Sequence, residues 1–268
     1  SYSILPALAM FKSLHPALKV TLYCIAFTGI YLLAYFIKAP VYNEYEKLPH
    51  AIIGVLVALL LTWLFLKADG KTFKQIGLFW EGSQTLLRFV RGVLIGIVLM
   101  GAMTLAVIFF SGFRIVLNPG STIPGFLWAS LSLLPLAFME EFAFRAYPLE
   151  TLKAKSGIRI TIFLTAFLFG AYHLANGWTL QDSFLGAGVW GIIFGLAALW
   201  SGGIALPTGL HYAVNLTTSA FTVSTGSYQL FLLKSADGQS LENYQGSQLE
   251  VLLPAICLLL TGLAAMEW

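Results

Sequence analysis

The chain alternates long apolar runs with short polar connections. A helix needs roughly 20 residues to cross the hydrocarbon core of a bilayer, and most of the runs approach that length. The runs are continuous and lack the ten-residue alternation of a membrane β-barrel. We therefore predict an all-α fold, a single integral membrane domain over residues 1–268 with about eight transmembrane helices, at residues 17–37, 50–66, 92–110, 124–147, 158–175, 184–200, 204–223 and 250–267.

Composition supports the membrane assignment. Hydrophobic residues make up 58% of the 268 positions and charged residues only 10%, whereas a soluble domain carries roughly 25% charge. The mean hydropathy is +0.83. These values are typical of a polytopic membrane protein surrounded by lipid.

Basic residues predict the orientation in the membrane. If the eight runs all span and Arg145 is left out as intramembrane, lysines and arginines gather on the side of the termini, so the positive-inside rule places both termini in the cytoplasm. They are spread over several loops, so we expect no nucleic-acid partner. The side of the termini has Lys12, Lys19, Lys67, Lys71, Lys74, Arg88, Arg91, Lys153, Lys155 and Arg159; the other side has Lys38, Lys47, Arg114 and Lys234.

Two connections carry weaker patterns. Residues 67–88 read as an amphipathic segment that lies at the membrane interface. The loop at 224–249 is polar and long, and we expect it to hold a short hairpin. Neither connection predicts a separate domain.

A few polar side chains fall inside the apolar runs. An ionisable group at the centre of a membrane helix costs at least ~2.5 kcal/mol, so each is a candidate functional residue. Because each also needs a polar partner in lipid, one shared intramembrane site satisfies them together. The candidates are Glu140, Glu141 and Arg145 in run 124–147, Phe169 and His173 in run 158–175, and His211 and Asn215 in run 204–223.

Helical spacing predicts how these groups meet. Glu141 and Arg145 are four residues apart and lie within ion-pair reach on one face, whereas Glu140 is rotated by about 100°. Glu140 and His173 are equally far from the midpoint between Ser156 and Gly157 in the basic connection at 153–159, so an antiparallel hairpin places both at one depth. Such a pair can take a proton from water. The alternative is structural: a buried ion pair and a histidine that links two helices.

The motifs that carry these residues resemble a known family. "EEFAFR" at 140–145, "FGAYH" at 169–173 and "HYAVN" at 211–215 are similar, in order and spacing, to the motifs of CPBP proteins. These are the CAAX proteases and bacteriocin-processing (Abi) intramembrane proteases, and they include the Ras-converting CAAX endopeptidase. The resemblance covers a core of about 125–225. Ala146 departs from it, because many relatives have glycine after the arginine.

The resemblance implies a fold and an activity. The family fold is an all-α membrane protein of eight helices, and the activity is intramembrane proteolysis of a peptide or membrane protein, here expected in the inner (cell) membrane of a bacterium. By resemblance, Glu140 and His173 activate the water. His211 and Asn215 stabilise the oxyanion or hold the water. The supporting positions are Glu141 and Arg145, which orient their helix, and Phe169 of the second motif.

A metal is left open by the sequence. Glu140, His173 and His211 are candidate ligands of zinc, and a metal-free glutamate and histidine mechanism is the alternative that we favour. No cofactor is firmly implied.

Two other functions compete with proteolysis. A non-proteolytic scaffold of the same fold would bind a membrane-protein partner and keep the polar cluster for stability. A transporter would use the intramembrane acid as a relay, but transporters usually show repeats, and residues 1–120 contain no second Glu/His cluster. A stripe of small residues, Ala187, Gly191 and Gly195, is interpreted as a helix-packing surface.

Overall fold

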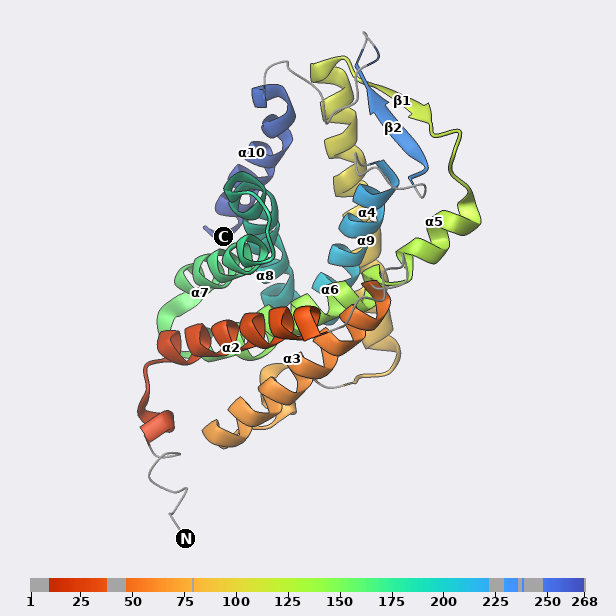
Figure 1. The fold of residues 1–268 in the computed structure, drawn as a ribbon. Helices are drawn as coiled ribbons and strands as arrows, with labels where there is room; N and C mark the ends of the chain where they lie inside the picture. Colours follow the sequence, from red (N-terminus) through yellow and green to blue (C-terminus); the bar gives the residue numbers. More distant parts are fainter. Residues whose placement is uncertain are drawn as a thin grey trace.

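The structure is a computed structural model that describes residues 10–37, 47–78, 80–221, 229–235, 238 and 248–267. Figure 1 shows a bundle of helices with one small pair of strands. The helices are α2 (Pro16–Ile37), α3 (Lys47–Asp69), α4 (Ser83–Ser111), α5 (Ile123–Ser130), α6 (Leu133–Glu141), α7 (Tyr147–Ala175), α8 (Val189–Ser201), α9 (Ala205–Phe221) and α10 (Gln248–Ala265). Shorter helical segments are the 3₁₀ turn η1 (Phe73–Ile76) and the π-helices η2 (Phe142–Ala146) and η3 (Asp182–Gly188).

The all-α prediction is confirmed, and the described part of each apolar run is mainly helical. Five helical stretches of the described residues are long and apolar enough to cross a membrane: Pro16–Ala34, Leu48–Asp69, Ser83–Phe110, Ile123–Ala175 and Asp182–Ser201. The chain is therefore an integral membrane protein. The runs at 204–223 and 250–267 correspond to α9 and α10, which have 17 and 18 residues.

The stretch Ile123–Ala175 has 53 residues and contains two of the predicted spans. Inside α7, Gly157 has φ 72° and ψ 166°, which no helix can accommodate. Glycine adopts this left-handed conformation without the steric cost of a Cβ atom. The chain bends there, inside the connection predicted at 153–159, and the second half of α7 returns toward α6.

Helices α4 and α9 cross at close range through glycines. A Cβ atom at Gly209 would collide with the backbone of Phe89, and one at Gly92 would collide with the carbonyl of Leu206. Small residues at such a crossing let two membrane helices approach closely. Figure 1 shows α4 and α9 side by side along most of α9, with α2 and α3 on another side of α6.

The segment at 67–88 contains the end of α3, η1 and the first turns of α4, which begins at Ser83, whereas the apolar run begins at residue 92. Its place at the membrane interface stays a prediction. The first turns of α4 carry Arg88 and Arg91, so the helix continues beyond the apolar span into polar surroundings.

The two strands join distant parts of the chain. Strand β1 (Arg114–Leu117) pairs antiparallel with β2 (Phe231–Lys234), with Arg114 opposite Lys234. The prediction of a hairpin within 224–249 is therefore not met by β2, whose partner follows α4. Residues 224–228 and 239–247 of that loop lie outside the described residues.

The buried centre of the molecule is the run from α6 through η2 into α7. Every residue from Met139 to Leu149 is buried, whereas α4 presents Leu94, Val98 and Phe109 outward. Apolar outer faces are expected where lipid surrounds the bundle. The polar motif at 140–145 consequently lies deep inside the protein.

Candidate functional site

The ion pair predicted between Glu141 and Arg145 is present. Arg145 Nη1 lies 3.2 Å from Glu141 Oε1, and both side chains are fully buried. Arg145 Nη2 donates to the carbonyl of Gly191 at 3.2 Å. The guanidinium lies 4.3 Å from the ring centre of Phe169 and 5.5 Å from that of Phe194. Arg145 thus connects η2 to α7 and α8, and Phe169 has a clear supporting contact.

Gly191 has both a packing and a polar contact. A Cβ atom there would lie 3.1 Å from Ala166 Cα and 3.2 Å from Arg145 Nη2, and one at Gly195 would lie 2.8 Å from Ile162 Cδ1. The small-residue stripe therefore does let α8 approach α7, as predicted. The same approach brings the Gly191 carbonyl to the arginine, which the sequence did not indicate.

His211 lies between the two glutamates. Its Nδ1 is 2.8 Å from Glu141 Oε1, and its Nε2 is 3.4 Å from Glu140 Oε2. The ring of Phe194 stacks on the imidazole, with centroids 4.3 Å apart and an interplanar angle of 18°. Since Arg145 also donates to Glu141 Oε1, one carboxylate oxygen receives both groups. Glu141 therefore orients the histidine of α9 as well as its own helix.

Glu140 has a second partner that sequence reasoning missed. The hydroxyl of Tyr172 donates to Glu140 Oε1 at 3.4 Å, and the Tyr31 and Tyr172 rings lie 6.0 Å apart. The hairpin was predicted to bring His173 to the carboxylate of Glu140. The hydrogen bond to that carboxylate comes from Tyr172, the residue directly before His173. A tyrosine beside the motif histidine in an apolar run was the available signal.

His173 is buried close to this group. Its Nδ1 lies 2.9 Å from the carbonyl oxygen of Phe169. The ring of Trp178 covers it edge-on at 4.5 Å. Because a carbonyl only accepts hydrogen bonds, Nδ1 carries the proton and Nε2 of a neutral ring keeps its lone pair.

Asn215 lies one turn after His211 on α9 and is partly buried. Within the described residues, no hydrogen bond joins its side chain to either glutamate. The polar groups that contact one another directly are therefore Glu140, Glu141, Arg145, His211 and Tyr172, with His173 close by.

The site suits zinc only in part. A histidine that ligates zinc normally donates its other ring nitrogen to a carboxylate or carbonyl, and the Nδ1 contacts of His211 and His173 are of this kind. Zinc also needs at least three protein ligands at about 2.0–2.2 Å. Among the described residues, no group of three or more His, Cys, Asp or Glu side chains is placed to hold an ion. The arrangement does not fit a bound zinc.

The comparison with protein families identifies the segment that holds these residues. The family model described as "Type II CAAX prenyl endopeptidase Rce1-like" matches residues 119–217. This segment is therefore similar to the Rce1-like family. It contains all three motifs, and its ends lie within eight residues of the core expected at 125–225. The resemblance to the CAAX proteases is confirmed for this segment. The comparison with curated proteins gave no match.

Proposed function

We propose that the chain is an intramembrane endopeptidase that hydrolyses a peptide bond of a membrane-associated substrate. One observation carries the proposal: Glu140 is buried 3.4 Å from His211 and 3.4 Å from Tyr172, inside the Rce1-like segment. A buried carboxylate with two polar neighbours, and a histidine close by, can exchange a proton with a water molecule.

In the proposed reaction Glu140 takes one proton from water, and the resulting hydroxide adds to the scissile carbonyl carbon. The carbon–nitrogen bond then breaks, and the same proton passes to the leaving amine. His173 assists through its Nε2, which can accept a hydrogen bond from the attacking water. No step requires another reactant.

His211 and Asn215 are proposed to stabilise the oxyanion. His211 is held by Glu141 at Nδ1, so its Nε2 is fixed in direction and donates when protonated. Asn215, one turn further along α9, presents an amide from the same helix. Removing one oxyanion donor typically costs ~3 kcal/mol in the transition state, which is about 100-fold in rate.

The competing function is a scaffold of the same fold that binds a membrane-protein partner. Glu140→Gln separates the two. The full chain in lipid nanodiscs is incubated with a farnesylated CAAX-type peptide that becomes fluorescent on cleavage, and mass spectrometry identifies the products. We expect cleavage by the parent, none by Glu140→Gln, and the same elution volume for both. Equal cleavage by both proteins would refute Glu140 as the base, and no cleavage by the parent would favour the scaffold.

We also propose that the protein lies in a bacterial cell membrane as one domain with both termini in the cytoplasm, as the distribution of lysines and arginines predicts. The test is a C-terminal fusion to a reporter that is active only in the cytoplasm. An active reporter is expected, and a reporter active only on the outer side would reverse the orientation.

A further inference from the structure

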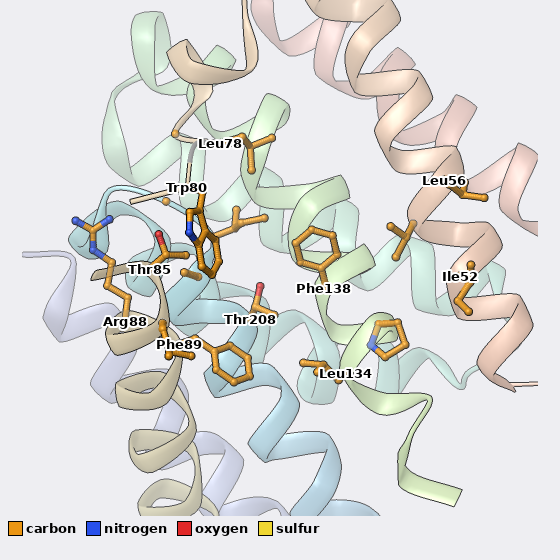
Figure 2. A pocket seen from close by; sticks show the side chains of 17 residues that line it. Ile52, Leu56, Leu78, Trp80, Thr85, Arg88, Phe89, Leu134, Phe138 and Thr208 are labelled. Atoms are coloured by element: carbon orange, nitrogen blue, oxygen red, sulfur yellow. The ribbon is translucent and has the colours of Figure 1, made fainter. Parts of the chain in front are cut away.

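A cavity lies beside the candidate site but outside it. It has a volume of about 720 Å³, is open on one side, and is lined by α3, α4, α6 and α9 together with the connection before α4. Figure 2 shows Ile52 and Leu56 of α3 on one side, Phe89 of α4 on the other, and Leu134 and Phe138 of α6 between them. Neither Glu140 nor His211 lines it. Its wall is almost entirely apolar, and its size suits a drug-sized or larger apolar group.

One edge of this cavity is basic. Arg88 belongs to its lining and also to that of a neighbouring pocket of about 460 Å³, which Arg91, Trp200 and Ser201 line as well. In Figure 2 the Arg88 guanidinium points away from Phe138 and Leu134. The two pockets therefore adjoin at Arg88, with an apolar chamber on one side of it and a basic chamber on the other.

The charge of the basic chamber is not fully compensated. Arg88 Nη1 pairs with Glu81 at 2.6 Å, with about a third of each side chain exposed. Arg91 is exposed, and no ion pair within the described residues neutralises it. The three groups together carry one net positive charge. Trp80 and Trp200 are 75% and 78% exposed, as is usual for tryptophans at the level of lipid headgroups.

A polar atom inside the apolar chamber also lacks a partner. Thr208 is only 4% exposed, lines the cavity, and its hydroxyl makes no hydrogen bond within the described residues. Leaving a buried hydroxyl unpaired costs free energy. In Figure 2 the Thr208 side chain lies between Phe89 and Phe138, at the wall of the cavity.

We propose that the two chambers bind one anionic phospholipid. Arg88 and Arg91 hold its phosphate, Thr208 donates to an ester carbonyl, and one acyl chain occupies the cavity. A basic pocket between transmembrane helices is the usual site for an anionic headgroup, and an apolar chamber directly below it suits the attached chain. The site is independent of the proposed proteolysis, since it uses none of the candidate catalytic residues.

Lipid binding to the purified full chain tests the charges. Native mass spectrometry in detergent, with added phosphatidylglycerol or phosphatidylcholine, gives the affinity of each lipid. Each arginine near a membrane surface contributes about 5-fold in affinity for an anionic lipid. We expect one tightly held phosphatidylglycerol, about 30-fold weaker binding by the double variant Arg88→Gln, Arg91→Gln, and stronger binding by Glu81→Gln, which releases Arg88 from its partner.

The matched control is Arg114→Gln, because Arg114 is exposed just beyond the other end of α4, about 35 Å along the helix. It should bind as the parent does. Glu81→Gln is expected to strengthen lipid binding and the arginine variants to weaken it, and a general loss of structure cannot produce both effects. Equal retention of phosphatidylcholine, or no change in the double variant, would overturn the proposal.

The acyl chain needs a separate test. Ala205 lines the cavity, so Ala205→Phe should fill it and weaken phosphatidylglycerol binding at least 10-fold. Ala102→Phe on the exposed face of α4 should not. Thr208→Val should weaken binding about 5-fold. If millimolar inorganic phosphate displaces the lipid, the site binds simple anions. If the farnesylated peptide displaces it, the cavity binds the substrate of the protease. Either result would overturn the proposed phospholipid site.

Discussion

Arg145→Met is the sharpest test of the charged network. Methionine retains much of the side-chain volume but removes the guanidinium, and with it the ion pair to Glu141 at 3.2 Å and the hydrogen bond to Gly191 at 3.2 Å. Glu141 is then left fully buried with only His211 opposite it. Breaking a buried pair by removing one partner typically costs about 3–5 kcal/mol.

That free energy should appear as lost stability before it appears as lost chemistry. For a domain of this size, each kcal/mol lowers the unfolding temperature by roughly 2–4 °C, so Arg145→Met should unfold about 6–20 °C below the parent. The double variant Glu141→Gln, Arg145→Met removes both charges. It should be less destabilised than the sum of the single variants, because the two side chains are in contact.

Thermal unfolding in one detergent, followed by tryptophan fluorescence, measures both quantities. The matched control is Arg159→Met, whose partner Glu267 lies at 2.6 Å but with both side chains more than 60% exposed. It should unfold like the parent, since exposed pairs contribute little. If Arg145→Met unfolds at the parental temperature and is only slower in hydrolysis, Arg145 belongs to the catalytic group and its structural role is wrong.

Three further outcomes are expected. Tyr172→Phe removes the hydroxyl that donates to Glu140 and should slow hydrolysis by about 5-fold at unchanged stability; an unchanged rate would exclude it from the site. Metal analysis of the purified protein should find less than one zinc per chain, and activity should survive chelation. Stoichiometric zinc, with activity lost to a chelator and restored by zinc, would refute the metal-free mechanism. Gly209→Val should reduce folded yield strongly, because a side chain there collides with α4, while Gly29→Val, in open space on α2, should not.

The sequence correctly predicted the features that depend on a single helix or on a single hairpin. Apolar runs located the helices, the four-residue spacing paired Glu141 with Arg145, and the symmetry of the turn brought the end of α7 to Glu140, one residue from the expected contact. Each prediction needed only helical geometry and a connection of a few residues.

Contacts between elements that are distant in sequence could not be predicted in the same way. His211 is 70 residues from Glu141, and its position depends on how α9 packs on α4 and α6. The π-helix η2 also begins directly after the glutamates, and its wider turn changes which face each later residue occupies. The need for polar partners in lipid therefore placed His211 in one site with the glutamates, without showing that it lies between both carboxylates.

The net charge of the site predicts that replacing Glu140 and replacing Glu141 have different effects on stability. Glu140, Glu141, Arg145 and His211 are all at most 5% exposed, and with both carboxylates ionised and the histidine neutral they carry one net negative charge. Glu141 is paired with Arg145, so the uncompensated charge is that of Glu140, and burying such a charge is costly. This carboxylate is also the group that takes the proton from water in the proposed hydrolysis.

The variants Glu140→Gln and Glu141→Gln should therefore differ in unfolding temperature. Glu140→Gln removes the uncompensated buried charge, so its unfolding temperature should equal or exceed that of the parent while hydrolysis is lost. Glu141→Gln removes the negative charge between Arg145 and His211 and leaves a buried cation without its partner, so it should unfold well below the parent. Both substitutions preserve size and shape, and each serves as the control for the other. If the two variants lose stability equally, the division between a catalytic and a structural glutamate is wrong.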